Sequence, residues 1–544
     1  MNKTKNKNLI IYFFILVIFS TFAITSQINL TNDINLNSDA FFHLQRYINL
    51  CKRLQDGKIG LYMDYYAMHN YGYPTPLFYP ELFMYPFAIL TLFKIPYIVS
   101  FKLFIITIFF CTAISMFYVL NKYIEKNNKK QNIMSVIFSL IYAFNFLQYR
   151  HLVAGRYAEL LAMIFIPLVL YGMYSLIEYN HGIKYIIFGM SGLIYSHILT
   201  AVFISITIFL LLLLNIKKIL KNKNIIANLL KSALLTLLIT AKQILPMLEM
   251  MTSDQYIYTY SFAKRPSFNE MTTQILKEIN PIISIIICLS FIFFIIISNY
   301  ISNKTKYIIL GIFIFLFNTN LFDWSFIENN LTKFTDIIQF PRRIMPPVIA
   351  LILIGLYILI YNNENYKIIK KITNTFIFLI FIINISIFAY GPMPNNNDYL
   401  YSNNVKSFDE GIYVGAYDYL STKFDLQGIT DEKDSYIEDI GNLFLNNKNN
   451  EEIIITQNKT TYNITSRTDK STLELPILYY KGYKIKNDKN LEIKESENGL
   501  IEINNVEKNQ EIIIKYSMTP IQIISLLISL FAIIFIIYLY KHSA

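Results

Sequence analysis

The sequence has few charged residues for its length, and this shortage limits the class of protein at once. Only 16% of the 544 residues are charged, whereas 54% are hydrophobic and the mean hydropathy is +0.39. Soluble domains usually carry about 25% charged residues. The composition therefore excludes a soluble fold and indicates a protein that lies in a membrane.

Cysteine is scarce, and the three cysteines of the chain predict no covalent or metal-bound framework. Cys111 and Cys288 lie in apolar runs, and Cys51 stands alone. Such isolated residues make neither a disulfide scaffold nor a CxxC zinc site. The P-loop, GxGxxG, HExxH and GxSxG motifs are also absent from the sequence, so none of the chemistry that they support is indicated.

Acidic residues are fewer than basic ones, which makes the formal net charge +11. A basic protein can bind nucleic acid, but in a membrane protein lysines gather first in the cytoplasmic loops, where they determine topology. We therefore predict membrane lipid as a partner and no nucleic acid.

Long apolar runs are abundant. The first, 9–25, follows Lys3, Lys5 and Lys7 and predicts a membrane anchor, with a cleavable signal peptide as the alternative. Further runs, long enough or nearly so to cross a hydrocarbon core of about 30 Å, fall near 97–120, 133–149, 160–178, 185–199, 200–216, 227–246, 281–300, 307–322, 346–361, 373–390 and 519–540. Together they predict a polytopic α-helical membrane protein with about twelve transmembrane helices.

The lysines assign a side to each loop. A cytoplasmic N-terminus places on the cytoplasmic side the basic stretches Lys122–Lys130, Lys217–Lys231, Lys304–Lys306, Lys367–Lys371 and Lys541. The apolar stretch 77–93 must then be a helix that does not cross, and Pro80 and Pro86 interrupt it. We predict a multi-pass protein of the cell membrane with both termini in the cytoplasm.

The segments predicted outside are 27–96, 150–159, 249–280, 323–345 and 391–518. The last one alternates apolar and polar residues, which predicts antiparallel β-structure, in 452–456, 461–466, 472–475, 491–494, 500–503 and 511–516. The predicted domains are a membrane domain over 1–390, which includes the first outside loop 27–96, an extracytoplasmic β-sandwich-like domain over 391–518, and a membrane helix with a short cytoplasmic tail over 519–544.

The first outside loop carries Asp39, His43 and Arg46, which share one face of a helix at this spacing. A carboxylate there could take a proton from a hydroxyl or hold a metal ion, and an arginine could bind a phosphate. The alternative is a solvated stripe whose Asp39 or Ser38 caps the helix. Tyr73 and Tyr79 follow in a segment rich in Tyr and Pro, which either anchors at the interface or lines a groove for a lipid chain or a sugar.

A second group of charged residues lies at the predicted outer ends of later helices. Arg156 and Glu159 stand beside an apolar run, where they could pair with each other or serve a substrate. Arg342 and Arg343 are outside arginines, against the positive-inside trend. His197 and Lys242 are weaker candidates, since single polar residues at helix ends are often structural.

These segments together resemble a known group of bacterial membrane proteins. The residues that carry the resemblance are Asp39-x-x-x-His43-Leu44-x-Arg46, Gly72-Tyr73-Pro74, Phe78-Tyr79-Pro80, Gly155-Arg156-Tyr157-Ala158-Glu159 with Pro167-Leu168, Ser196-His197, Gln339-Phe340-Pro341-Arg342-Arg343 and Tyr479-Tyr480-Lys481-Gly482-Tyr483. The chain resembles the 6-pyruvoyl-tetrahydropterin synthase-related membrane proteins, the YfhO-type proteins and, more remotely, the GT-C glycosyltransferases. The name of this group implies no pterin chemistry. The enzyme 6-pyruvoyl-tetrahydropterin synthase is a small soluble protein with a three-histidine zinc site, and that site has no counterpart here.

The resemblance implies a GT-C-like fold and a glycosyltransferase that takes a sugar from a polyprenyl-phosphate-linked donor and gives it to an extracytoplasmic glycan, lipid or protein of the cell envelope. It implies Asp39 and Glu159 as catalytic residues, and His43, Arg46, Tyr73, Tyr79, Arg156, His197, Arg342 and Arg343 as substrate-binding residues. Asp39 lacks the neighbouring acid of the common GT-C forms, which leaves a divalent metal cofactor open.

Two other functions fit the same sequence. A transporter or flippase for a lipid-linked glycan would need polar residues near the middle of the spans, whereas the ionisable residues here cluster at the outer ends. A non-catalytic membrane factor in cell-envelope assembly would keep the scaffold without the chemistry, and the lone Asp39 is compatible with it.

Overall fold

The structure is a computed structural model of the whole chain. It describes residues 33–35, 39–67, 72–123, 129–253, 267–271, 306–319, 322–332, 340–362, 367–390, 399–401, 421–423 and 453–542, together with single residues at 11, 15, 18, 335, 338 and 419.

Helices occupy every predicted apolar run that falls within the described residues. They are α5 (Tyr97–Lys122), α6 (Lys129–Ala143), α7 (Phe146–Val153), α8 (Tyr157–Ala162), α9 (Ile166–Tyr179), α10 (Ile183–Ile194), α11 (Ile198–Leu214), α13 (Lys223–Ser253), α16 (Lys306–Leu316), α19 (Met345–Asn362), α20 (Lys367–Tyr390) and α23 (Pro520–His542). Two further short helices, α12 (Ile216–Lys221) and α17 (Ser325–Asn330), belong to the connections between these runs. The runs 9–25 and 281–300 lie outside the described residues, apart from the single residues in the first.

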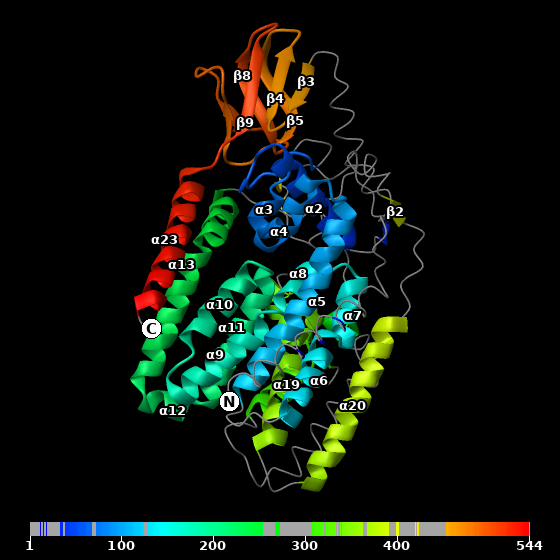
Figure 1. Cartoon of the computed structure of the whole chain (residues 1–544). Helices are drawn as coiled ribbons and strands as arrows, with labels where there is room; N and C mark the ends of the chain where they lie inside the picture. Colours follow the sequence, from blue (N-terminus) through cyan, green and yellow to red (C-terminus); the bar gives the residue numbers. More distant parts are fainter. Residues whose placement is uncertain are drawn as a thin grey trace. The chain divides into compact units, whose positions relative to one another are not determined.

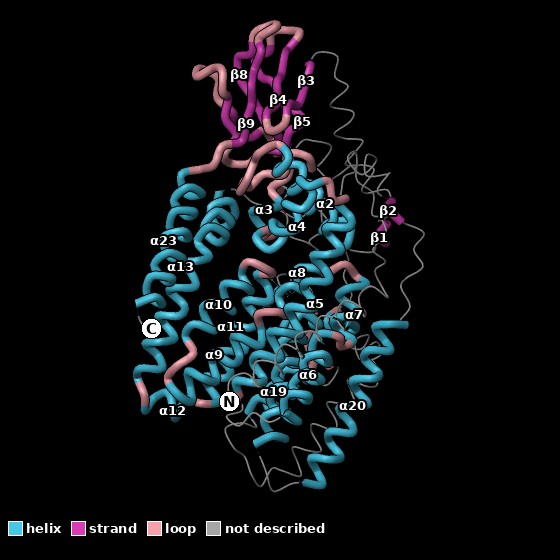
Figure 2. The backbone as a smooth tube through the Cα atoms, in the orientation of Figure 1, coloured by secondary structure: helices cyan, strands magenta, loops and turns pink. Residues whose placement is uncertain are grey.

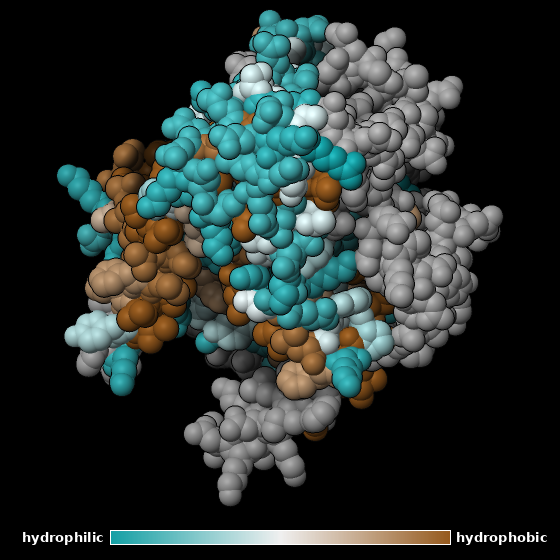
Figure 3. Space-filling model, turned by 90° about the horizontal axis from the view of Figure 1, so that it is seen from above, coloured by the Kyte–Doolittle hydropathy of each residue, from teal (hydrophilic) through white to brown (hydrophobic). Residues whose placement is uncertain are grey.

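Six of the described helical segments are long and apolar enough to cross a membrane. They cover Tyr97–Lys122, Asn132–Val153, Tyr157–Tyr179, Lys223–Ser253, Pro341–Ile358 and Pro520–Tyr538. The exposed side chains of α23 include many large apolar ones, as expected of a helix that faces lipid, and Figure 3 shows apolar and hydrophilic side chains gathered on different parts of one face. The protein is membrane-embedded, while the number of twelve spans stays a prediction.

Two helix boundaries differ from the prediction. The predicted span 133–149 is divided into α6 and α7, and α7 and α8 extend into the predicted loop 150–159. Asn145 begins α7, because its side-chain oxygen accepts a hydrogen bond from the backbone N–H of Gln148 at 3.1 Å. The predicted outside loop 150–159 is too long, because α7 runs to Val153 and α8 starts at Tyr157. This short connection places charged side chains on helices rather than in a loop.

The contacts divide the chain into two compact units. The helical unit consists of Met1–Ser38, Lys102–Leu237 and Arg265–Asn397, and the composite unit of Asp39–Phe101, Leu238–Lys264 and Asp398–Ala544. The division differs from the predicted boundaries at 390 and 518. The segment 39–96, which we continue to call the first outside loop after its predicted side, shares a unit with the β-structure.

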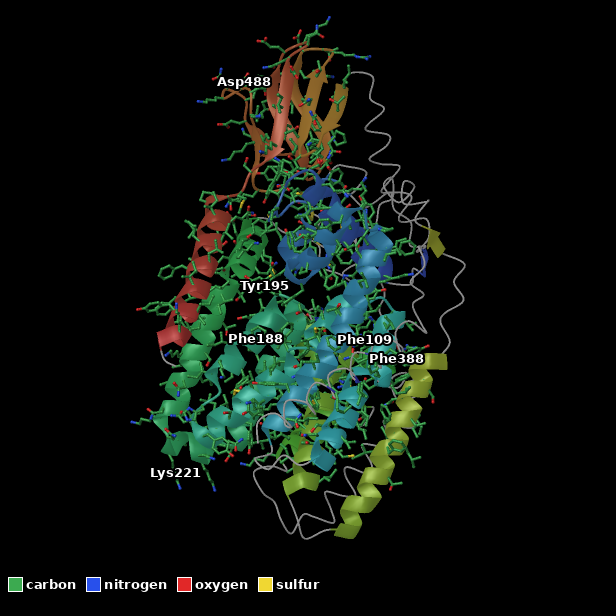
Figure 4. The ribbon with its side chains drawn as sticks, viewed as in Figure 1. Phe109, Phe188, Tyr195, Lys221, Phe388 and Asp488 are labelled. Atoms are coloured by element: carbon green, nitrogen blue, oxygen red, sulfur yellow. The ribbon has the colours of Figure 1, made fainter. Side chains whose placement is uncertain are left out.

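In the helical unit, α9 and α10 form a closely packed pair, and α19 packs on α16, α6, α9 and α11 (Figure 1). Glycines allow the close approach of α9 and α10. A Cβ on Gly192 would lie 2.2 Å from the ring of Phe165, and one on Gly189 would lie 2.5 Å from Val169. Small residues at helix contacts are typical of membrane proteins, where packing replaces the hydrophobic effect. Phe109 and Phe388, labelled in Figure 4, belong to an aromatic cluster of the same unit with ring centroids 5.4 Å apart.

The composite unit contains two antiparallel sheets in a β-sandwich (Figure 2). One sheet has the order β3-β4-β9-β6 and the other β5-β8-β7. The strands are β3 (Ile453–Asn458), β4 (Thr461–Ser466), β5 (Lys470–Leu478), β6 (Tyr483–Ile485), β7 (Ile493–Glu495), β8 (Leu500–Val506) and β9 (Glu511–Tyr516). The predicted strands are confirmed, and the short strand β6 was not predicted.

The core of the sandwich extends beyond the strands to the first outside loop. Buried side chains of Tyr65, Tyr73 and Leu77 belong to the same apolar cluster as Ile464 and Ile512 of the two central strands. This loop contains α2 (Ala40–Gln55), and the stretch predicted not to cross forms only short pieces, none long enough for a span. These are α3 (Thr75–Phe78), η1 (Leu82–Met84), α4 (Tyr85–Leu90) and η2 (Thr91–Phe93).

A proline in α13 creates a backbone group that the first outside loop satisfies. Pro246 has no N–H, so the carbonyl of Lys242 loses its helical partner. The Tyr62 hydroxyl donates to that carbonyl at 2.8 Å. Ser529 of α23 lies beside the same turn, where its hydroxyl accepts from the Lys242 N–H at 2.8 Å and donates to the Leu238 carbonyl at 3.3 Å.

We expect Tyr62→Phe to lower the free energy of unfolding by about 1–3 kcal/mol, because the Lys242 carbonyl would stay unpaired in a partly buried position. Thermal unfolding of the purified protein in detergent measures the change. Tyr97→Phe is the control, since it removes an exposed hydrogen bond to Gln55 and should change little. Equal effects of the two substitutions would contradict the role assigned to Tyr62.

Candidate functional site

Asp39 lies at the start of α2 in the composite unit, and its side chain is exposed. The carboxylate accepts no capping hydrogen bond from the helix, so Asp39 does not cap α2 as the sequence allowed. Most of the residues that follow it in α2 are buried. Asp39 is therefore an exposed acid at the end of a helix whose body is held in the protein.

His43 and Arg46 follow Asp39 on α2, but both are buried, so the alternative of a solvated stripe does not hold for these two residues. Arg46 Nη1 lies 2.9 Å from His43 Nδ1, and Arg46 Nη2 donates to the backbone carbonyls of Tyr79 at 3.0 Å and Pro80 at 3.2 Å. The guanidinium also lies 4.9 Å from the centre of the Tyr79 ring. Arg46 thus fastens the Tyr-Pro segment to α2 through its two Nη groups, which the protein engages.

Arg53, two turns further along α2, holds two carboxylates that the sequence analysis did not single out. Its Nε lies 3.0 Å from Asp64 Oδ1 and its Nη2 lies 2.6 Å from Glu81 Oε1, with all three side chains buried. Asp64 also exchanges backbone hydrogen bonds with Tyr73, of 2.9 and 3.0 Å. Tyr73 is buried rather than placed as an interface anchor. One feature of the sequence could have indicated this cluster: Arg53, Asp64 and Glu81 are charged residues in a loop rich in aromatic residues.

Two buried carboxylates share one arginine, and this affects their protonation. Burial raises the pKa of Asp64 from its usual 3.8 to about 7. The Arg53 guanidinium opposes the shift, while the charge of Glu81 adds to it. Glu81 lies closer to Arg53 than Asp64 does, so the positive charge of Arg53 stabilises the ionised form of Asp64 less than that of Glu81.

A second cluster lies in the helical unit and centres on Glu159 of α8. Glu159 Oε2 lies 2.9 Å from His151 Nδ1 of α7, and its Oε1 lies 3.3 Å from Arg343 Nε. Glu159 and His151 are buried, and the Arg343 side chain is 20% exposed. The sequence allowed Glu159 to pair with Arg156, and the structure instead joins it to an arginine far along the chain. A buried carboxylate in an apolar unit needs such partners.

The remaining predicted residues lie at helix starts in the helical unit. Arg156 precedes α8, and His197 precedes α11, where its ring nitrogen accepts from the Thr200 N–H at 3.3 Å. Arg342 belongs to η4 (Pro341–Ile344), and its guanidinium lies 4.1 Å from the centre of the Phe340 ring. Gln339 of the same motif lies outside the described residues. His197 thus acts as a helix cap, which is the structural role that the sequence allowed.

The structure brings the predicted residues together in two groups. Asp39, His43, Arg46, Tyr73 and Tyr79 belong to the composite unit. The helical unit holds Arg156, Glu159, His197, Arg342 and Arg343. The sequence analysis did not assign His151 as a partner of Glu159. His151 is the third-last residue of α7, and the sequence did not show where this helix ends.

A divalent cation at Asp39 would need further acidic or histidine ligands. Among the residues that the structure describes, no group of three or more His, Cys, Asp or Glu side chains could hold a metal ion. The residues present do not form such a donor set, and we derive no step through a metal.

These features define the class of protein: a helical, membrane-embedded protein with a C-terminal β-sandwich and buried ionic clusters. No protein family, no curated protein and no solved structure matches the chain.

We expect Asp64 to make the stability of the protein depend on pH. Because the folded protein binds this proton more tightly than the unfolded chain, the contribution of Asp64 is fully present below about pH 4 and is lost as the pH rises through about 7. Asp64→Asn should flatten the fall in melting temperature over this range, measured in detergent across a pH series.

The control for this measurement is Asp469→Asn, which changes an exposed aspartate of the sandwich. This variant should keep the pH dependence of the unchanged protein. If Asp64→Asn also kept it, another group would be responsible for the titration.

Proposed function

We propose that this chain is a membrane glycosyltransferase of the GT-C type, which moves a sugar from a polyprenyl-phosphate-linked donor to an extracytoplasmic acceptor. The observation that carries the proposal is the position of Asp39, an exposed carboxylate at the start of an otherwise mostly buried helix. A general base needs to be both accessible to the substrate and fixed in direction.

The packing of α2 supports this role. Arg46 binds the carbonyls of the Tyr79-Pro80 segment, and Arg53 binds Asp64 and Glu81, so that α2 is fastened to the rest of the loop by buried charged groups. Charge-assisted hydrogen bonds of this kind are stronger than neutral ones. They hold the backbone at Asp39 in one place, which keeps the carboxylate ready for proton transfer without rearrangement.

The proposed reaction is a single displacement at the anomeric carbon. The Asp39 carboxylate takes the proton of the acceptor hydroxyl as its oxygen forms the new bond to the sugar. The bond from the sugar to the lipid phosphate breaks, and the phosphate leaves with the electron pair. One displacement inverts the configuration at this carbon. The resemblance also implies a catalytic role for Glu159 and substrate-binding roles for Arg156, Arg342 and Arg343, which belong to the helical unit.

The flippase alternative receives less support from the helical unit. Glu159 is the third residue of the candidate span Tyr157–Tyr179, Arg343 the third of Pro341–Ile358, and His151 lies near the end of Asn132–Val153. Ionisable groups at the ends of spans suit binding at the membrane surface, whereas transport sites lie near the middle.

The proposal is tested by Asp39→Asn in cells that express the full chain. We expect the transferred sugar to disappear from the surface glycans and the lipid-linked donor to accumulate, because loss of a general base slows a reaction by about 10²–10⁴-fold. Mass spectrometry of surface glycans and of extracted lipid-linked sugars measures both quantities, after immunoblotting has confirmed equal amounts of protein in the membrane.

Asp469→Asn serves as the matched control, since it also replaces an exposed aspartate of the composite unit by asparagine. Its glycans should not change. Unaltered glycans and donor in the Asp39→Asn cells would refute the transferase with Asp39 as base and favour the non-catalytic factor. Accumulation of donor confined to the cytoplasmic leaflet would favour the flippase instead.

A further inference from the structure

One end of the helical unit carries a group of lysines that no catalytic role uses. We call it the lysine face, and it consists of Lys122, Lys184, Lys217, Lys218, Lys221, Lys223 and Lys306. The side chains of Lys217, Lys221 and Lys223 are exposed at the turn from α11 through α12 into α13. Lys221, labelled in Figure 4, points away from the end of α12.

Contacts between the helices show that these lysines share one end of the unit. Lys218 of α12 pairs with Glu178, at the end of α9, at 2.7 Å. Asn228 of α13 donates to Asn180, in the turn between α9 and α10, at 3.0 Å. The ends of α9 and α11 and the starts of α10 and α13 therefore meet here.

Two further contacts add α16 and α5 to the same end. Lys306 at the start of α16 donates to Asn215, between α11 and α12, at 2.7 Å. The hydroxyls of Tyr118, near the end of α5, and Tyr185, near the start of α10, lie 3.0 Å apart. Lys122 and Lys184 lie over these tyrosine rings, with Nζ to ring-centre distances of 5.4 and 5.2 Å.

In the described segments at this end, the charge is almost entirely positive. In the described segments that meet here, 116–123, 175–186, 212–231 and 306–310, Glu178 is the one acidic residue, and it is already paired with Lys218. Tyrosines at this depth are typical of the boundary between lipid and water.

Apolar side chains stand among the exposed lysines of α12. Ile216 is 45% exposed and Leu220 is 68% exposed, next to Lys217 and Lys221. Such a mixture suits a segment at the membrane surface, where the apolar side chains enter the hydrocarbon and the lysines extend to the head groups.

We propose that the lysine face binds the phosphate head groups of anionic phospholipids in the cytoplasmic leaflet. Lysines are compact charges that bind phosphate without requiring a fixed orientation, and an anionic leaflet attracts basic groups that lie within a Debye length of its surface. The three exposed lysines at the turn into α13 provide most of the free positive charge, while Lys218 and Lys306 also hold helices together. This binding is independent of the transferase reaction.

The test uses the purified full chain in a neutral detergent, so that the measured binding does not depend on the orientation of the protein in a membrane. Palmitoyl-oleoyl phosphatidylglycerol and the phosphatidylcholine with the same chains are titrated separately at low ionic strength, and native mass spectrometry measures the bound lipid. We expect tighter binding of phosphatidylglycerol. Replacing Lys217, Lys221 and Lys223 together by glutamine should reduce this preference by about tenfold or more.

The control variant replaces Lys484, Lys486 and Lys489 of the sandwich by glutamine, which removes the same charge from exposed lysines of the composite unit. It should keep the preference. Equal binding of the two lipids to the unchanged protein, or an equal loss in both variants, would overturn the proposal. So would a lysine-face variant that still prefers phosphatidylglycerol but no longer binds a poly-glutamate peptide, since the partner would then be an acidic protein.

Discussion

A charge or a backbone polar group that leaves water must find a partner inside the protein, and this requirement organises both units. Arg53 meets it with Asp64 and Glu81, and Glu159 meets it with His151 and Arg343. Removing one partner from such a group costs more than the pair contributes, because the other charge stays buried. The segments that carry these residues are therefore tied together, however far apart they lie in the sequence.

The same requirement explains why the β-sandwich is not a separate module. The first outside loop contributes Tyr65 and Tyr73 to the sandwich core, and its Tyr62 satisfies the carbonyl that Pro246 leaves unpaired in α13. Lys481, after β5, reaches Glu249 of α13 at 3.1 Å, and Glu249 also accepts from the Thr519 hydroxyl at 2.5 Å. The loop that carries Asp39 is thereby supported by strands, by α13 and by the start of α23.

The two kinds of charged residue in this protein have opposite surroundings. The residues of the ionic clusters are paired and, apart from the partly exposed Arg343, buried, which gives them fixed positions. The lysines at the turn into α13 are exposed and face almost no acid, which leaves them able to attract anions. The first arrangement suits the proposed catalysis, because preorganised groups need no rearrangement, and the second suits the proposed contact with a lipid surface.

The sequence by itself determined the membrane class, the apolar runs in which the long described helices lie, and nearly all strands of the sandwich. These depend on the length of apolar runs and on alternation between near neighbours, and both are local properties. Only the tertiary structure decided which charges meet. Asp39, His43 and Arg46 share a helix face in the sequence, yet Asp39 is exposed and Arg46 is buried, and Glu159 pairs with Arg343 rather than with Arg156. Partner choice depends on how distant segments pack, and no spacing along one helix contains that information.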